Sequence, residues 1–132
     1  MKLLELGRQV VAVWNTRNPE EVGRFYGDKT VFHDPLVAKE TTGQALVSYA
    51  AGIFEAFPDL HFKVFSEAVG PNLVMFEWAQ CGNNTGSIMG MPATNRYIEI
   101  PAVSVLKYRD ETLISHYDYW DMKKLMNDLG VL

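Results

Sequence analysis

The chain has 132 residues, of which 48% are hydrophobic and 21% charged, with a formal net charge of −4. This composition is typical of one globular domain, residues 1–132. The acidic balance and the lack of a long Lys/Arg cluster argue against a nucleic-acid partner, and no segment approaches the roughly 18 apolar residues of a membrane span. The single cysteine, Cys81, excludes an intrachain disulfide and is typical of a reducing compartment. We therefore expect a cytoplasmic protein that binds neither nucleic acid nor membrane.

The first predicted element is an amphipathic helix. Apolar residues between Leu3 and Trp14 recur at spacings of three and four, which places them on one helical face. Glu5 and Arg8 interrupt this apolar segment, and no small-residue cleavage site follows it. The pattern therefore predicts a helix of the folded domain rather than a signal peptide.

Two further helices and one strand follow. Asn18 is predicted as the N-cap of the second helix, with Pro19 at its first position, and this helix ends near Gly27. Residues 29–35, "KTVFHDP", predict a brief strand. Residues 44–57 carry apolar side chains at helical spacing and are followed by a proline, so they predict a third helix.

The second half of the chain predicts four strands and a closing helix. The predicted strands span residues 60–69, 73–81, 96–108 and 113–121, and the helix spans residues 122–130 with Gly130 as its C-cap. Pro101, inside the third of these strands, implies a bulge or an edge position. The Gly- and Asn-rich residues 82–95 predict irregular structure.

This order of elements predicts an α+β fold. Strands joined by short turns favour an antiparallel meander, and helices gathered in one part of the chain favour a helical layer packed on the sheet. A strongly curved sheet wrapped on about three helices would enclose a conical hollow. The aromatic residues and methionines of this chain could line such a hollow.

Several segments resemble a known family. These are "FHDP" in the first strand, "AFPDL" after the third helix, the long segment "GSIMGMPATNRYIEIPAVSVLKYRDETLISHYDYWD" and the closing "LMNDLG". Over nearly its whole length the chain resembles the SnoaL-like polyketide cyclases of the NTF2-like superfamily. The resemblance implies an NTF2-like cone, in which a curved antiparallel sheet and about three helices enclose an apolar pocket. It also implies a homodimer formed through the sheets.

The same resemblance implies a chemistry. In the cyclases, an acidic residue at the end of the last strand is the acid/base for an intramolecular aldol closure, without cofactor or metal. Asp121 occupies the matching position here. Family members often read Gly-Thr-His-Thr-Gly in the middle of the sheet, whereas this chain has "GNNTG", with Asn84 in place of the histidine. The resemblance therefore implies a hydrophobic small-molecule ligand and Asp121 as the catalytic residue.

The last strand offers the same candidate by its alternation. If it is regular, Tyr117, Tyr119 and Asp121 share one face, and His116 lies on the other. Two phenols and a carboxylate suit a pocket wall, because phenols can donate hydrogen bonds to a carbonyl and a carboxylate can take a carbon-bound proton. Asp121 also directly precedes the last helix, so it could equally be the N-cap of that helix, and the two roles are not exclusive.

Other candidates are weaker. His33 and Asp34 are neighbours on the first strand, so one of them could face the hollow, although an aspartate before a proline is more commonly a turn residue. Asn83 could offer its amide to a ligand or satisfy an irregular loop, and the second interpretation is preferred. Cys81 is expected to be buried, and the spacing of the histidines predicts no metal site. The predicted lining consists of Trp14, Tyr49, Phe54, Trp78, Met89 and Met91.

Three functions are consistent with these observations. The first is cofactor-free acid/base chemistry, an aldol-type cyclisation or an isomerisation, on a hydrophobic carbonyl compound, with Asp121 as acid/base and Tyr117 and Tyr119 as donors. The second is a non-catalytic NTF2-like ligand-binding protein, which the substitution at Asn84 favours. The third is epoxide hydrolysis of the limonene-epoxide-hydrolase kind, which needs several polar groups around one water and ranks last because the arginines lie near strand ends.

Overall fold

The computed structural model describes residues 2–37 and 41–131. Within these ranges the helices and strands follow one another in the predicted order. They are α1 (Leu3–Asn15), α2 (Pro19–Phe25), β1 (Val31–His33), α3 (Gly43–Ala56), β2 (His61–Val69), β3 (Leu73–Asn83), β4 (Tyr97–Arg109), β5 (Thr112–Trp120) and α4 (Met122–Leu129).

Local capping explains where two of the helices begin and end. Oδ1 of Asn18 accepts hydrogen bonds from the backbone N–H groups of Glu20 and Glu21, at 3.0 and 3.2 Å. Gly130 follows α4 with a φ of 76°, a left-handed conformation in which a side chain would be strained. Both predicted caps are therefore confirmed.

The strands form one curved sheet in the order β1-β5-β4-β3-β2. β2 to β5 make the predicted antiparallel meander, whereas β1 is added to β5 in parallel, a pairing that the sequence pattern did not predict. In this pairing Phe32 lies opposite His116 and His33 lies opposite Tyr117. The parallel register therefore brings Asp34, the residue after β1, close to the second half of β5.

Pro101 lies in β4, which is an interior strand of the sheet. It is paired with Ala79 of β3, but the pairing of β4 with β5 begins only at Ala102. Pro101 therefore has a neighbouring strand on one side only, a local edge position that tolerates the missing N–H.

An extra residue in β5 sets which of its side chains face inward. Tyr108 pairs with Leu113, but the next residue of β4, Lys107, pairs with Ser115, so Ile114 is a bulge. Because side chains alternate along a strand, an insertion of one residue exchanges the two faces of everything beyond it. In the observed register His116 lies opposite the buried Leu106.

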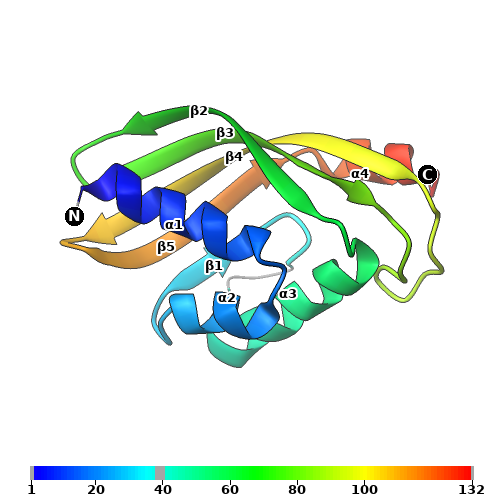
Figure 1. The fold of residues 1–132 in the computed structure, drawn as a ribbon, viewed down its shortest axis with the longest axis horizontal. Coiled ribbons are helices and arrows are strands. Elements are labelled where there is room, and N and C mark those ends of the chain that lie inside the picture. Colours follow the sequence, from blue (N-terminus) through cyan, green and yellow to red (C-terminus); the bar gives the residue numbers. More distant parts are fainter. Residues whose placement is uncertain (1, 38–40, 132) are drawn as a thin grey trace.

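The molecule has two layers. Figure 1 shows α1 lying along the sheet, with α2 and α3 beside it on the same side and α4 at the far end of the sheet. The core lies between these helices and the inner face of the sheet, where Leu46, Phe32 and Phe76 are fully buried. In the described part of the chain, no helix is both long and apolar enough to cross a membrane.

Candidate active site

A small cavity lies between the helical layer and the inner face of the sheet. Its volume is about 50 Å³, room for a few water molecules, and partly exposed side chains such as Val64 leave it partly open. Its apolar lining includes Val10, Val11, Phe32, Ile53, Leu60, Phe62, Phe76 and Leu106. Its polar lining is Asp34, Tyr49, Gln80, Ser104, His116 and Asp118, together with the indoles of Trp14 and Trp78.

Asp34 is a buried carboxyl group at one end of this cavity, with 4% of its surface exposed. Its Oδ1 accepts hydrogen bonds from the hydroxyl of Tyr49 and the backbone N–H of Leu36, and its Oδ2 accepts one from the indole N–H of Trp120 at 3.0 Å. Burial, together with the charge of Asp118 and a hydrogen bond to it, raises the pKa of Asp34 to about 8. Asp34 is therefore protonated at neutral pH.

Asp118 is the ionised partner of Asp34. Its Oδ1 accepts hydrogen bonds from Oγ of Ser104 at 2.5 Å and from Nε2 of His116 at 2.6 Å. Burial alone would raise the pKa of Asp118, but attraction to His116 and the hydrogen bonds from His116, Asp34 and Ser104 outweigh it and hold the pKa below its ordinary value. Ser104 is itself fixed by the indole N–H of Trp78, at 2.8 Å.

A chain of hydrogen bonds fixes His116 from the other side. The indole N–H of Trp14 donates to the hydroxyl oxygen of Tyr26 at 2.8 Å, and that hydroxyl lies 2.5 Å from Nδ1 of His116. Nε2 of His116 carries the proton that it donates to Asp118. The contacts with Tyr26 and Asp118 therefore fix the His116 ring at both nitrogens.

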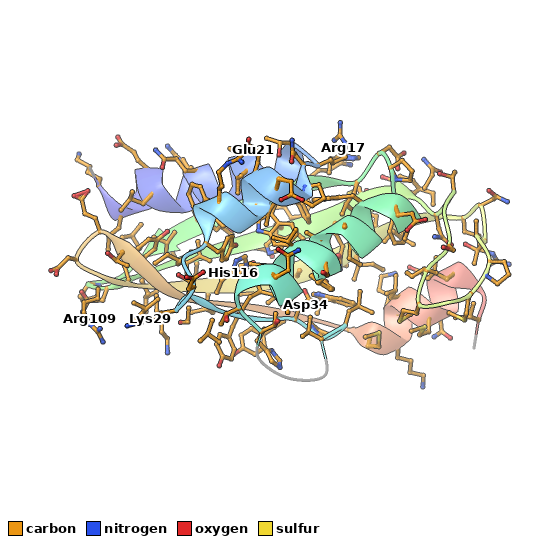
Figure 2. The ribbon with its side chains drawn as sticks, turned by 90° about the horizontal axis from the view of Figure 1, so that it is seen from below. Arg17, Glu21, Lys29, Asp34, Arg109 and His116 are labelled. Carbon is orange, nitrogen blue, oxygen red and sulfur yellow. The ribbon has the colours of Figure 1, made fainter. Side chains whose placement is uncertain are left out.

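The arrangement places an acid beside a base in a largely apolar space. Asp34 follows β1 and Asp118 and His116 lie on β5, so the parallel β1–β5 pairing assembles the site. In Figure 2, Asp34 and His116 lie toward the interior of the molecule, whereas Arg17 and Arg109 project from its periphery. A neutral carboxylic acid can donate a proton while its ionised neighbour can accept one, which is the requirement for general acid/base catalysis.

Comparison with known proteins identifies the family of the chain. The sequence model of the family described as "SnoaL-like polyketide cyclase" matches residues 5–129. The chain belongs to the SnoaL-like polyketide cyclase family. No curated protein matches it at a significant level.

Solved structures of other proteins show the same fold. TsrD from Streptomyces laurentii superimposes with a TM-score of 0.81 at 19% identity, covering 98% of this chain and 96% of that one. IdmH from Streptomyces antibioticus, which has been assigned as a polyketide cyclase, gives 0.80 at 18%, covering 99% and 100%. A Catenulispora acidiphila protein with a ketosteroid isomerase-like fold, in complex with trimethylamine, gives 0.78 at 19%, covering 97% and 94%.

The residue that the sequence placed in the SnoaL-like pocket, Asp121, lies elsewhere. Its side chain is exposed, does not line the cavity, and accepts hydrogen bonds from the backbone N–H groups of Lys123 and Lys124 at 2.9 and 3.3 Å. The N-cap interpretation is thus confirmed.

The two faces of β5 were assigned the wrong way round. Tyr119 is 55% exposed, and Tyr117 stacks on His33 with ring centroids 5.2 Å apart on the outer face of the sheet. His116, expected on the outer face, is buried and lines the cavity. The alternation holds beyond the Ile114 bulge, and the inward face was chosen from the chemistry of the two phenols. His116 and Asp118 lie inward because Tyr26 and Ser104 satisfy their polar atoms there.

Three residues of the predicted lining border the cavity. Trp14, Tyr49 and Trp78 line the cavity, whereas Phe54 is buried in the core and Met91 packs against the core without reaching the cavity. Met89 is 53% exposed. It belongs to a separate outer groove of about 290 Å³ between α3 and residues 87–90, which shares Tyr49 and Ile53 with the cavity.

The two loop asparagines have structural roles. Asn83 donates its backbone and side-chain N–H groups to Asp59, at 2.8 and 2.7 Å. Asn84 is fully buried and satisfies backbone groups of Ala56 and Thr94. Cys81 is buried, as expected. The described residues include no group of three or more His, Cys, Asp or Glu side chains arranged to hold a metal.

Sequence reasoning missed Asp118, Ser104 and Gln80 and preferred a turn role for Asp34. The sequence of β4 does indicate one of these residues, Ser104. Glu99 and Lys107 share one face of this strand, and their charges indicate that this face is exposed to solvent. Ser104 lies on the opposite face, among isoleucines and leucines. A polar residue at such an inward position indicates a buried partner.

Proposed function

We propose that this protein catalyses cofactor-free proton transfer on a hydrophobic carbonyl compound, in an aldol-type cyclisation or an isomerisation, with Asp34 as the acid and Asp118 as the base. The observation that carries the proposal is the contact between a protonated Asp34 and an ionised Asp118 at the wall of a largely apolar cavity. Two carboxyl groups whose surroundings move their pKa values apart are the usual arrangement for an acid and a base that work together.

The acid step follows from the neutral state of Asp34. A carboxylic acid can donate a hydrogen bond to a carbonyl oxygen, and this bond strengthens as negative charge develops on that oxygen in an enolate or an alkoxide. The apolar side chains around Asp34 lower the local dielectric and increase this stabilisation. Tyr49, which donates to Asp34, keeps the carboxyl group in a fixed orientation.

The base step follows when the substrate engages Asp34. In the free protein Asp118 is a weak base, because Asp34, His116 and Ser104 all stabilise its charge. A carbonyl group that takes over the hydrogen bond of Asp34 removes one of these three and increases the proton affinity of Asp118. The carboxylate, still oriented by His116 and Ser104, then accepts a proton from the carbon next to the carbonyl, and proton exchange between the two carboxyl groups restores the pair.

Deuterium exchange at a small ketone tests this proposal without the natural substrate. The protein should accelerate the exchange of the α-protons of acetone, which suits a cavity of about 50 Å³, in deuterated buffer, followed by proton NMR. Asp34→Asn and Asp118→Asn should each lower the accelerated rate by roughly 10²- to 10⁴-fold. Asp121→Asn is the matched control and should leave the rate unchanged. Full activity of both buried variants, or loss of activity in the control alone, would contradict the proposal.

A non-catalytic ligand-binding role is the second candidate, and the low pKa of Asp118 favours it, because an ionised group with so many hydrogen bonds is a poor base. Ligand binding alone would quench the fluorescence of Trp14 and Trp78, which line the cavity, without any isotope exchange. Epoxide hydrolysis has no such support, since no arginine is among the described residues that line the cavity.

A further inference from the structure

The outer groove between α3 and residues 87–90 has no part in the proposed acid/base chemistry, yet it is larger than the cavity. Its volume is about 290 Å³, against about 50 Å³ for the cavity. Small-molecule sites in proteins begin at about 300 Å³, so the cavity alone holds only the end of most ligands. Tyr49 and Ile53 line both spaces and form the wall between them. The outer groove is therefore placed to receive the part of a ligand that the cavity cannot hold.

A glycine in the middle of α3 lines the outer groove without a packing reason. Ser48, Gly52 and Glu55 are four and three residues apart and form one exposed row on this helix. Glycine inside a helix costs stability. In α1 and α2, a Cβ at Gly7 or Gly23 would lie 2.8 or 2.3 Å from a neighbouring side chain, which explains those two glycines. At Gly52 a Cβ would meet no atom within 4 Å, so the missing side chain leaves open space and makes no close contact possible.

The opposite wall of the outer groove is a tight turn that carries an exposed methionine. Two backbone hydrogen bonds, of 3.0 and 2.8 Å, join Ile88 and Met91. Met89 and Gly90 form the turn between them, with φ values of 49° and 76°. This conformation favours asparagine or glycine and strains a methionine, and Met89 is 53% exposed, so little of its side chain packs on the protein. Strained backbone is common at ligand sites, and the flexible thioether of methionine adapts to ligand shape.

The lining of the outer groove indicates an uncharged, largely apolar ligand. Its aliphatic side chains are Leu36, Ile53, Ile88 and Met89. Among the described residues that line it, Glu55 is the only charged one, and its carboxylate would repel an acidic ligand. The hydroxyl groups of Ser48 and Ser87 are on exposed residues and can stay hydrated beside an apolar chain.

The wall between the groove and the cavity can open at Tyr49. Its hydroxyl donates its one proton to Oδ1 of Asp34, at 3.1 Å. Asp34 also accepts hydrogen bonds from the backbone N–H of Leu36 and the indole N–H of Trp120, and these two bonds hold the carboxyl group if Tyr49 moves. A rotation of the Tyr49 side chain would therefore join the two spaces and leave the acid/base pair in place.

We propose that the outer groove binds the aliphatic chain of an acyclic ketone, whose carbonyl end reaches the cavity between Tyr49 and Ile53. The inference rests on the proposed function for the position of the carbonyl group. The cavity then holds the carbonyl group with one small substituent, such as a methyl group. An unbranched chain has the smallest cross-section of any organic substituent and needs the least displacement of the wall. The substrate class is therefore a ketone with a long unbranched chain that carries no acidic group.

Filling the outer groove at Gly52 tests the inference. In Gly52→Leu the added side chain leans over the preceding turn of α3, which carries Ser48 and Tyr49, and so occupies the groove and not the cavity. Gly52→Ala is the matched control, because it changes helix propensity similarly and leaves the groove open. Calorimetric titration gives the dissociation constants of 2-pentanone and 2-nonanone for the wild type and both variants, and deuterium exchange gives their activity on acetone.

Binding should depend on chain length in the wild type. Each methylene group buried in the groove should tighten binding by up to about fourfold, so 2-nonanone should bind at least about tenfold more tightly than 2-pentanone. Gly52→Leu should weaken the binding of 2-nonanone by about tenfold or more, whereas Gly52→Ala should bind it like the wild type. Both variants should exchange the protons of acetone at the wild-type rate, because acetone needs only the cavity.

The outcomes separate this inference from the proposed function. Equal binding of 2-nonanone by the wild type and Gly52→Leu, which is expected if the chain leaves the cavity beside Val64, would overturn the role of the groove. Absence of 2-nonanone binding to the wild type would overturn it too. Binding that depends on Gly52, without deuterium exchange in either ketone, would retain the groove and reject only the catalytic proposal. The thermal unfolding temperature of Gly52→Leu should equal or exceed that of the wild type, which checks that the variant is folded.

Discussion

The chemistry of this site depends on how two carboxyl groups share one proton. Asp34 and Asp118 both lie in the protein interior, but only Asp118 receives hydrogen bonds from Ser104 and His116. Those donors stabilise the charge on Asp118, and that charge in turn keeps Asp34 protonated. The difference between the two pKa values is therefore a property of the neighbouring residues and should change when they change.

Stability should depend on pH through Asp34. Its pKa is about 8 in the folded protein and about 3.9 in an unfolded chain, so between these values the folded state holds a proton that the unfolded state has lost. Stability should therefore fall as pH rises from about 4 to 8, by at most about 1.4 kcal/mol per pH unit. The pKa of Asp118 is lowered, so the ionisation of Asp118 changes the stability only at pH values below this range.

Urea unfolding of the wild type and Asp34→Asn at several pH values measures this effect. The asparagine mimics the neutral acid and cannot ionise, so the difference in unfolding free energy should shift in favour of Asp34→Asn as pH rises. A difference that stays constant from pH 5 to pH 8 would show that Asp34 is not protonated in the folded protein.

Asp121 should matter for stability and not for activity. Replacement by alanine removes the acceptor for the first N–H groups of α4 and should cost about 0.5–2 kcal/mol of unfolding free energy. The rate of ketone exchange per folded molecule should be unchanged. Chemical denaturation together with the exchange assay checks both parts, and a folded but inactive Asp121→Ala would contradict the placement of the site.

Among the secondary-structure elements, β5 could be predicted from the sequence only in part. Its existence, its length and its alternation were predictable from apolar periodicity and from the turn that precedes it. Which face lies inward was not, because both faces carry aromatic and polar side chains and the choice between them depends on tertiary packing. Tyr117 and Tyr119 looked like a pocket wall by composition, yet the polar His116 and Asp118 occupy the interior because Ser104 and Tyr26 satisfy them.

The hydroxyl of Tyr26 links α2's C-cap region to β5 and should contribute to both stability and activity. Tyr26→Phe leaves Trp14 Nε1 and His116 Nδ1 without partners, which should cost about 1–3 kcal/mol. It should also lower the exchange rate, since His116, which orients Asp118, loses the contact that holds its ring from the other side. Tyr97→Phe removes an exposed hydroxyl and is the matched control; equal effects of the two substitutions would contradict the buried chain.

The loop after β3 is held against α3 by a close backbone contact. A Cβ added at Gly86 would lie 1.9 Å from the carbonyl oxygen of Glu55, so Gly86→Ala should destabilise the protein by about 1–3 kcal/mol or more. Gly52 lies on α3 with open space around it, and Gly52→Ala should instead stabilise the helix by about 0.5–1 kcal/mol. Thermal unfolding compares the two, and similar changes in both would contradict the contact.

At the scale of the whole molecule, the sequence was sufficient for the architecture. The α+β order, the meander and the hollow fold follow from local periodicity, capping residues and the family segments such as "FHDP". The parallel pairing of β1 with β5 joins residues more than eighty positions apart and leaves no local signature. That pairing brings Asp34 and Asp118 together. The fold was therefore predictable from the sequence, whereas the contact between these two carboxyl groups was not.

The outer face of the sheet is expected to form a homodimer contact. Phe65 and Tyr119 are 59% and 55% exposed there, and exposed aromatic residues are common at such interfaces. Light scattering should give twice the chain mass, and Tyr119→Glu should shift the protein toward the monomer by placing a charge in the contact. A monomer mass for the wild type at all accessible concentrations would contradict this expectation.

The pKa of Asp34 in the folded protein tests the central claim most directly. Carbon NMR of labelled aspartate carboxyl groups, assigned by comparison with Asp34→Asn, follows each group from pH 3 to pH 10. The account predicts that the Asp34 carboxyl titrates near pH 8, while Asp118 is already ionised below its ordinary range. If Asp34 instead titrates near pH 4, both groups are ionised at neutral pH, the cavity holds no acid, and the proposed mechanism is wrong.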